Sequence, residues 1–166
     1  GALSIMRALV TGASGYIGHH VCLELLSRGW EVHALTRPGS DLRGLETPRH
    51  DADGSFASLD AALAAARPEV VLHLASMVKA RIDPSETGSM VEANIGFGST
   101  LLEAMRARGC CRFVNASTFW IYASDGAVRP LTFYAATKLA FEQIVSYHAS
   151  DALHAISLVI FDVYGP

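Results

Sequence analysis

The chain has 166 residues, of which 51% are hydrophobic and 17% charged, and its formal net charge is −3 at pH 7. This length suffices for one domain with a buried core and is too short for a cofactor domain together with a full substrate domain. The high apolar share excludes a disordered chain and suits a sheet that is covered on both faces. No run of about 18 apolar residues predicts a membrane span, and no cluster of Lys and Arg predicts a nucleic-acid surface.

The cysteines indicate a reducing compartment. Cys22, Cys110 and Cys111 are odd in number and lack the spacing of a metal site, so we expect free thiols, no bound metal and a cytoplasmic protein. The segment Gly1–Ser4 lacks the basic region that begins a secretory signal, so we expect no signal peptide there.

Short apolar strands alternate with longer helical stretches along the chain. In chain order we predict strands and helices at Ala8–Val10, Tyr16–Arg28, Glu31–Thr36, a short third strand before Asp51, Ser58–Arg67, Val70–Leu74, Ser89–Arg108, Arg112–Ala116, Tyr134–Ala149 and Ala155–Phe161. Alternation at this spacing requires βαβ units with right-handed crossovers. The sequence therefore predicts an α/β domain with a doubly wound parallel sheet.

A glycine-rich turn, Thr11–Gly18, lies between the first strand and the first helix and reads Thr-Gly-Ala-Ser-Gly-Tyr-Ile-Gly. Its glycines permit a tight turn and let backbone N–H groups reach a pyrophosphate at the helix N-terminus, where the helix dipole favours negative charge. Gly18 would also let the helix pack closely on the sheet. A strand before the motif and a helix after it favour a dinucleotide site over an ordinary tight turn. The expected contacts are Gly12, Ser14, Gly15, Tyr16, Ile17 and Gly18.

The spacing Thr-Gly-x-x-Gly-x-x-Gly resembles that of the short-chain dehydrogenase/reductase superfamily. Tyr16-Ile17 and the stretch His73–Ser76 are similar to its extended branch, the epimerases, dehydratases and reductases of nucleotide sugars. The segment Phe161–Pro166 is similar to the Phe-Asn-Val-Tyr-Gly-Pro that leads into the sugar-binding part of those enzymes, with Asp162 in place of the commoner Asn. The resemblance implies an NAD(P)-binding Rossmann domain over residues 1–166, from which the C-terminal substrate-binding segment is missing.

The end of the predicted second strand bears on the choice of dinucleotide. An NAD site usually has Asp or Glu about 20 residues past the glycines, whereas this chain has Thr36 followed by Arg37. A hydroxyl beside a guanidinium suits a 2′-phosphate, so NADP is favoured over NAD; the alternative is that Arg37 is a solvated loop charge. The resemblance implies that Asp51 meets the adenine amine and that His73 and Ala75 line the cofactor. Their alternatives are a loop cap for Asp51 and a core residue for His73.

Tyr134 and Lys138 are four residues apart at the start of a predicted helix and so share a face. A phenol has a pKa of about 10 in water, and a neighbouring ammonium lowers it, which would let Tyr134 relay a proton near neutral pH. The resemblance implies that both residues contact the cofactor and that Lys138 hydrogen-bonds the nicotinamide ribose. The alternative is an exposed helical pair.

The third catalytic position follows the predicted strand Arg112–Ala116. The resemblance of Ile121-Tyr122 to the family's Val-Tyr places Thr118 at the catalytic Ser/Thr position, where its hydroxyl would polarise the reacting oxygen. Ser117 precedes this position by one residue, and strand alternation would direct its side chain to the opposite face of the sheet. Asn94 resembles a family asparagine that supports the active site; the alternative is a plain helix asparagine.

Phe119 and Trp120 stand where the dehydratases of this branch have Asp-Glu, and neither can move a proton. These two residues and the short loop from Thr118 to Tyr134 resemble the corresponding segment of the reductases that act on 4-keto-6-deoxy nucleotide sugars. The resemblance thus implies an NAD(P)-dependent reductase acting on a nucleotide-diphosphate sugar and assembling as a homodimer. A nucleotide-sugar 4-epimerase and a non-catalytic dinucleotide-binding sensor of the same fold are the alternatives.

Overall fold

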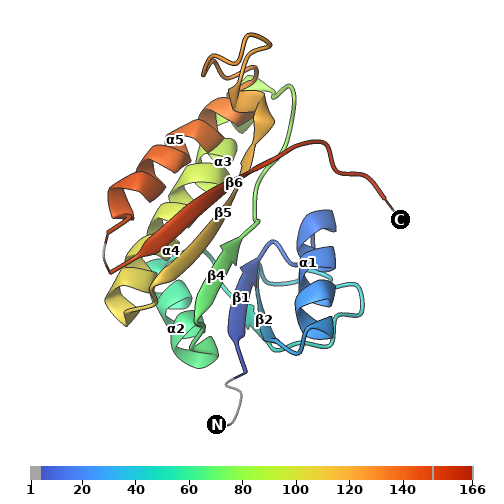
Figure 1. The fold of residues 1–166 in the computed structure, drawn as a ribbon, viewed down its shortest axis with the longest axis vertical. Coiled ribbons are helices and arrows are strands. Elements are labelled where there is room, and N and C mark those ends of the chain that lie inside the picture. Colours follow the sequence, from blue (N-terminus) through green and yellow to red (C-terminus); the bar gives the residue numbers. More distant parts are fainter. Residues whose placement is uncertain (1–4, 151, 166) are drawn as a thin grey trace.

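A parallel sheet carries the architecture of the chain (Figure 1). The computed structural model describes residues 5–150 and 152–165, and over these residues the sheet has six strands in the order β3-β2-β1-β4-β5-β6. The strands are β1 (Arg7–Thr11), β2 (Glu31–Thr36), β3 (Arg49–Asp51), β4 (Val70–His73), β5 (Arg112–Thr118) and β6 (His154–Ile160). This is the doubly wound order of a Rossmann fold, whose switch point lies between β1 and β4. The predicted fold class is confirmed; the expectations for Gly1–Ser4 and for Pro166 fall outside the described residues.

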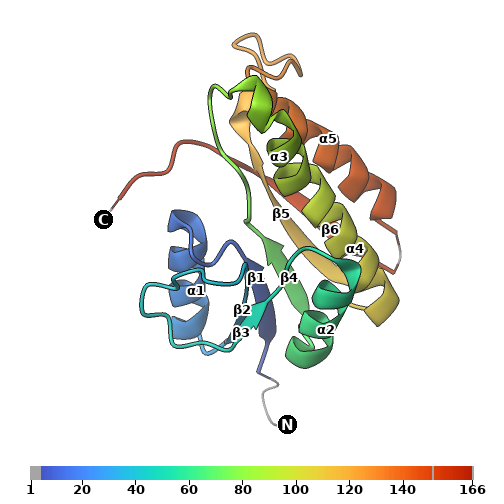
Figure 2. The same ribbon diagram turned by 180° about the vertical axis from the view of Figure 1, so that it is seen from behind.

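The helices lie on both faces of the sheet (Figures 1 and 2). They are α1 (Tyr16–Ser27), α2 (Phe56–Ala66), α3 (Thr87–Val91), α4 (Phe97–Arg108) and α5 (Phe133–His148). Successive strand residues face opposite layers: Leu9 of β1 packs with core residues of α2, α4 and α5, whereas Val10 packs with Cys22 of α1. None of these helices in the described part of the chain is long and apolar enough to cross a membrane.

Local signals fix the ends of the helices. The side chains of Ser55 and Thr132 cap α2 and α5 by accepting hydrogen bonds from backbone N–H groups in the first turn. Gly109 ends α4 in the left-handed region, with a φ of 67°, as its sequence position predicts. The predicted boundaries lie within two residues of the observed ones, and those of β2 are exact; β5, for instance, continues two residues further, to Thr118.

The predicted helix Ser89–Arg108 is not one regular α-helix. A π-helical turn, Glu92–Gly96, separates α3 from α4. Such turns are rare, and they are frequently found at functional sites. It contains Asn94, which is 1% exposed and therefore turned into the protein rather than towards solvent.

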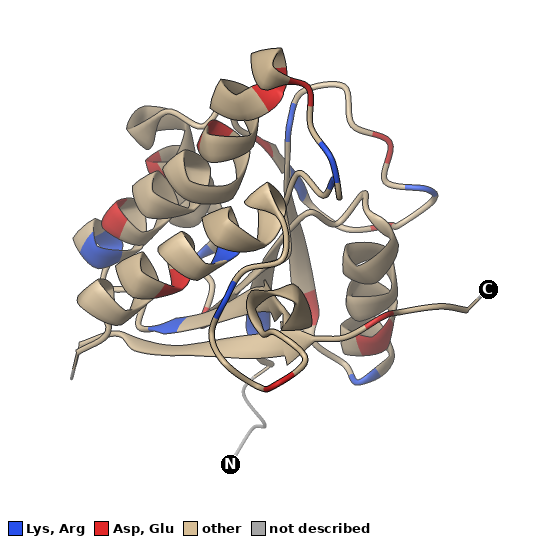
Figure 3. Cartoon of the chain, turned by 90° about the horizontal axis from the view of Figure 1, so that it is seen from above, with Lys and Arg blue, Asp and Glu red and all other residues tan. Residues whose placement is uncertain are grey.

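Part of one sheet face has no helix over it within the described residues. The strand register aligns Val10, Leu72, Val114 and Ile156 across the sheet, on the face that α1 covers at β1 and β2. On β6 of that face, Ile156 is 55% exposed and Leu158 50% exposed. Basic and acidic residues are interspersed over the helices and loops (Figure 3).

We predict that Gly18→Ala destabilises the fold. A Cβ at Gly18 would lie 2.0 Å from the carbonyl oxygen of Gly12, so the helix must move away from the turn. We expect the free energy of unfolding to fall by about 3 kcal/mol, the upper range for overpacking, as measured by denaturant unfolding. Gly88→Ala is the control, because nothing lies within 4 Å of its added Cβ; an equal loss in both variants would contradict the packing argument.

Candidate active site

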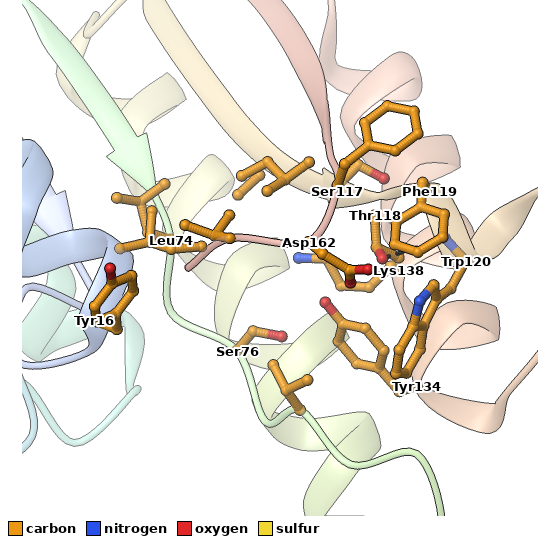
Figure 4. Close-up of a pocket in the computed structure, with 16 residues that line it drawn as sticks. Tyr16, Leu74, Ser76, Ser117, Thr118, Phe119, Trp120, Tyr134, Lys138 and Asp162 are labelled. Carbon is orange, nitrogen blue, oxygen red and sulfur yellow. Dashed lines mark hydrogen bonds between the residues drawn. The ribbon is translucent and has the colours of Figure 1, made fainter. Parts of the chain in front are cut away.

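A cleft of about 300 Å³ lies at the carboxyl edge of the sheet, around the switch point (Figure 4). Its walls come from the start of α1, the segment after β4, the end of β5, the start of α5, the end of β6 and the residues that follow it. In doubly wound sheets this edge is where ligands bind. The sequence motifs therefore converge on one place.

The glycine turn is built for close backbone approach. Gly12 has a φ of +72°, and a Cβ there would lie 2.7 Å from the backbone nitrogen of Ala75. Gly15 donates its N–H to Gly12 and precedes α1 without a side-chain cap. The first N–H groups of α1 thus have no partner within the helix and suit an anion. Ser14 is half-buried, and Tyr16 and Ile17 line the cleft.

The hydroxyl of Thr11 joins the ends of β1 and β4. Its oxygen accepts hydrogen bonds from the N–H groups of Leu74 at 3.1 Å and Ala75 at 3.0 Å, so its own hydrogen is directed to Nδ1 of His73 at 2.9 Å. This arrangement holds the segment after β4 against the glycine turn.

His73 does not point its side chain into the cleft, contrary to the expectation that it lines the cofactor. The ring is 1% exposed and packs against Phe97, Phe113 and Phe141. Burial, reinforced by the charge of Lys138, lowers the pKa of His73 to about 3, so the ring stays neutral. His73 is a core residue that acts on the site through Thr11.

Tyr134 and Thr118 meet at the centre of the cleft (Figure 4). Both are buried, at 8% and 7% exposure. Burial raises the pKa of Tyr134, while hydrogen bonds with Ser76 and Thr118 act in the opposite direction. The pKa of Tyr134 is therefore raised rather than lowered as expected, because desolvation is the largest influence on it. Ser117 is also buried, but its Oγ has no hydrogen-bond partner among the described residues.

Lys138 is not part of an exposed helical pair. Its side chain lies beside Tyr134 in the wall of the cleft and is 2% exposed. Burial lowers the pKa of its ammonium to about 8, and the charge of Glu142 raises it in part.

Asn94 connects the segment after β4 to α5. Its Oδ1 accepts from the hydroxyl of Ser76 at 3.0 Å and from the N–H of Met77 at 2.7 Å. Its Nδ2 donates to the carbonyl of Met77 and to the hydroxyl of Thr137, each at 3.0 Å. Ser76, which the sequence argument did not single out as a site residue, is thereby aimed at Tyr134. Its position just after β4, at the carboxyl edge, was the signal available.

The residues expected at the adenosine end also lie together. Thr36 donates to Oδ1 of Asp51 at 2.8 Å, and Arg49 donates to the same oxygen at 2.7 Å. Arg49, and after it Thr36, lowers the pKa of Asp51. The exposed Arg37 side chain contacts no partner among the described residues, while its carbonyl accepts from Arg49 at 3.2 Å. A carboxylate therefore does lie beside Thr36, supplied by β3 rather than β2.

Aromatic side chains form the wall next to Tyr134. Phe119 stacks on Phe161, with ring centroids 5.1 Å apart and planes 6° apart. Trp120 meets Tyr134 edge to face at 6.1 Å. Asp162 adds a carboxylate to the same cleft.

Comparisons with known proteins agree with this geometry. Residues 8–166 match the model of the NAD dependent epimerase/dehydratase family. The chain is 30% identical to a probable UDP-glucuronate 4-epimerase of Rhizobium meliloti (strain 1021), covering 97% of this chain and 54% of that protein. It is 36% identical to a 3-diazoavenalumate denitrifying reductase of Streptomyces sp, covering 97% and 57%.

Among solved structures, the UDP-glucose 4-epimerase of Thermus thermophilus in complex with NAD superimposes with a TM-score of 0.82 at 33% identity, covering 93% of this chain and 54% of that one. The chain thus spans about half the length of these relatives. The matched residues include the glycine turn, the β4 segment and the Tyr134 helix. The chain therefore belongs to the NAD dependent epimerase/dehydratase family, in the extended branch of the short-chain dehydrogenases/reductases.

Proposed function

We propose that residues 1–166 bind a nicotinamide dinucleotide and carry the hydride-transfer chemistry of an oxidoreductase that reduces a keto group of a nucleotide-diphosphate sugar. The observation that carries the proposal is the Tyr134 hydroxyl, buried between Thr118 and Ser76 and close to Lys138. These groups line the same cleft as Tyr16 and Ile17, which begin α1 just after the glycine turn.

The cradle fits the dinucleotide. Gly12 and Gly18 leave no room for a Cβ, and the uncapped start of α1 suits a pyrophosphate. The nicotinamide, when bound, supplies the hydride. Because burial raises the pKa of Tyr134, the phenol keeps its proton at neutral pH and serves as the acid that protonates the carbonyl oxygen. Thr118 orients that oxygen, and the Lys138 ammonium stabilises the phenolate that remains.

A nucleotide-sugar 4-epimerase is the second candidate, favoured by the names of two of the relatives above. It would use the same Tyr134 in both directions, taking a proton when hydride leaves the sugar and returning it when hydride comes back to the other face. Loss of water is a poorer match, since Phe119 and Trp120 offer no acid or base beside Thr118. Assembly as a homodimer stays a prediction.

We infer a preference for NADP(H) from the charges at the adenosine end. Arg49 balances the carboxylate of Asp51, and Arg37 remains as a second cation, whose side chain has no partner among the described residues. The local balance is one positive charge, which favours an added 2′-phosphate.

Arg37→Ala is expected to weaken NADPH binding roughly tenfold, the value of one charge-assisted contact, and to leave NADH binding within about twofold. Fluorescence titration of both cofactors measures this. Arg43→Ala removes a like charge from the same loop and should have little effect. Equal affinities for the two cofactors, unaltered by Arg37→Ala, would refute the preference.

Tyr134→Phe is expected to lower kcat by a factor on the order of 100 or more, because it deletes the proton donor. Cofactor affinity should change little. Tyr147→Phe is the matched control on the same helix, where the ring is 83% exposed.

The assay offers the intact protein a panel of 4-keto nucleotide sugars with NADPH, and of nucleotide-hexoses with NAD. Net oxidation of NADPH supports the reductase, whereas interconversion of hexoses without net cofactor change supports the epimerase. Equal turnover by wild type and Tyr134→Phe would overturn the assignment of Tyr134.

A further inference from the structure

A carboxylate without a hydrogen-bond partner among the described residues lies one helical turn beyond Lys138. Tyr134, Lys138 and Glu142 follow one another at intervals of four residues on α5, so their side chains lie along one stripe of the helix. Oε1 of Glu142 is shielded from solvent and accepts no hydrogen bond from the described residues. A desolvated carboxylate oxygen with no donor is costly, so its retention calls for a reason.

The ammonium of Lys138 also lacks a hydrogen-bond partner among the described residues. The residue is only 2% exposed and lines the cleft, and its ammonium forms no hydrogen bond or ion pair with any residue in the described part of the chain. Burial favours its neutral form, and among the described groups the charge of Glu142 is the influence that favours the charged form. The Glu142 carboxylate therefore acts on Lys138 through space, across one turn of α5, rather than through a hydrogen bond.

The other titratable groups near Lys138 do not take over this role. His73, facing it from β4, has a strongly lowered pKa and stays neutral. Tyr134, on α5, has a raised pKa and also stays neutral. Asp162, which lines the same cleft after β6, is exposed, so its charge is screened by water.

We propose that Glu142 is a positioning residue whose carboxylate keeps the buried Lys138 protonated and so preserves the ammonium beside Tyr134. The inference rests on the proposed function, in which Lys138 stabilises the Tyr134 phenolate. It adds a third member, from the next turn of α5, to the Tyr134–Lys138 pair.

The direction of the effect follows from the sign of the charge. Burial lowers the pKa of Lys138 to about 8, and this value includes the opposing charge of Glu142. Removing a negative charge one helical turn away should lower that midpoint by on the order of one pH unit. The proton would then be lost close to neutral pH.

The test is to follow Lys138 directly by NMR of the protein labelled with ¹³C at the lysine ε-carbon. Lysine occurs at positions 79 and 138 of this sequence, and the Lys138 signal is assigned by its loss in Lys138→Arg. Glu142→Gln is expected to shift the titration midpoint down by on the order of one unit. Glu142→Asp keeps the charge, so its Lys138 midpoint should lie close to that of wild type. Glu46→Gln, at an exposed position, should leave the Lys138 midpoint unchanged.

An unchanged Lys138 midpoint in folded Glu142→Gln would overturn the proposal. If that variant does not fold, Glu142→Met, an uncharged side chain of similar length, takes its place, and an unchanged Lys138 midpoint there refutes the coupling.

The rate profile separates this inference from the proposed function. If Lys138 takes part in turnover, the alkaline limb of kcat/KM moves to lower pH in Glu142→Gln by the shift that NMR measures. If the Lys138 midpoint shifts in the NMR titration but the alkaline limb of kcat/KM does not move, the coupling between Glu142 and Lys138 is upheld. The catalytic role given to Lys138 is then refuted.

Discussion

One hydroxyl fixes the geometry on which the cleft depends. Thr11 ends β1, and its oxygen holds two N–H groups of the segment that follows β4. Because that hydroxyl hydrogen is directed to a neutral, buried His73, the acceptor geometry of the oxygen is set. The glycine turn then lies so close to Ala75 that a Cβ on Gly12 would be 2.7 Å from the Ala75 nitrogen. The same arrangement places Ser76 where it hydrogen-bonds with Asn94 and Tyr134. Hydrogen bonds from the segment after β4 to Thr11 therefore connect the two halves of the sheet at the switch point.

Much of this was accessible from the sequence. The alternation of apolar runs and helical stretches predicts the parallel sheet, and Gly109 predicts the end of α4, because these signals are local. The placement of Tyr134 against Thr118 rather than Ser117 follows from strand alternation and helical spacing. The π-helical turn had no local signal, since the inward position of Asn94 depends on partners from two distant segments.

Burial is the physical quantity that the sequence argument lacked. Spacing alone suggested that an ammonium lowers the pKa of Tyr134, but both side chains are enclosed, and desolvation dominates each of them. For His73 the structure agrees with the alternative of a core residue, because aromatic rings enclose its side chain. At the proposed adenosine end, the neighbour of Thr36 comes from another strand. The pattern of β2 therefore did not indicate that Asp51, which was expected near the adenine, lies beside Thr36 with Arg49 to neutralise it.

The strand order also separates two functions in space. Thr36 stands at the end of β2 and Thr118 at the end of β5, with β1 and β4 between them, which amounts to three strand spacings or roughly 14 Å. Groups that far apart, with no shared partner, contribute independently to free energy. Changes to the proposed dinucleotide preference at Thr36 and to the proposed chemistry at Thr118 can therefore be combined, with free-energy effects that add.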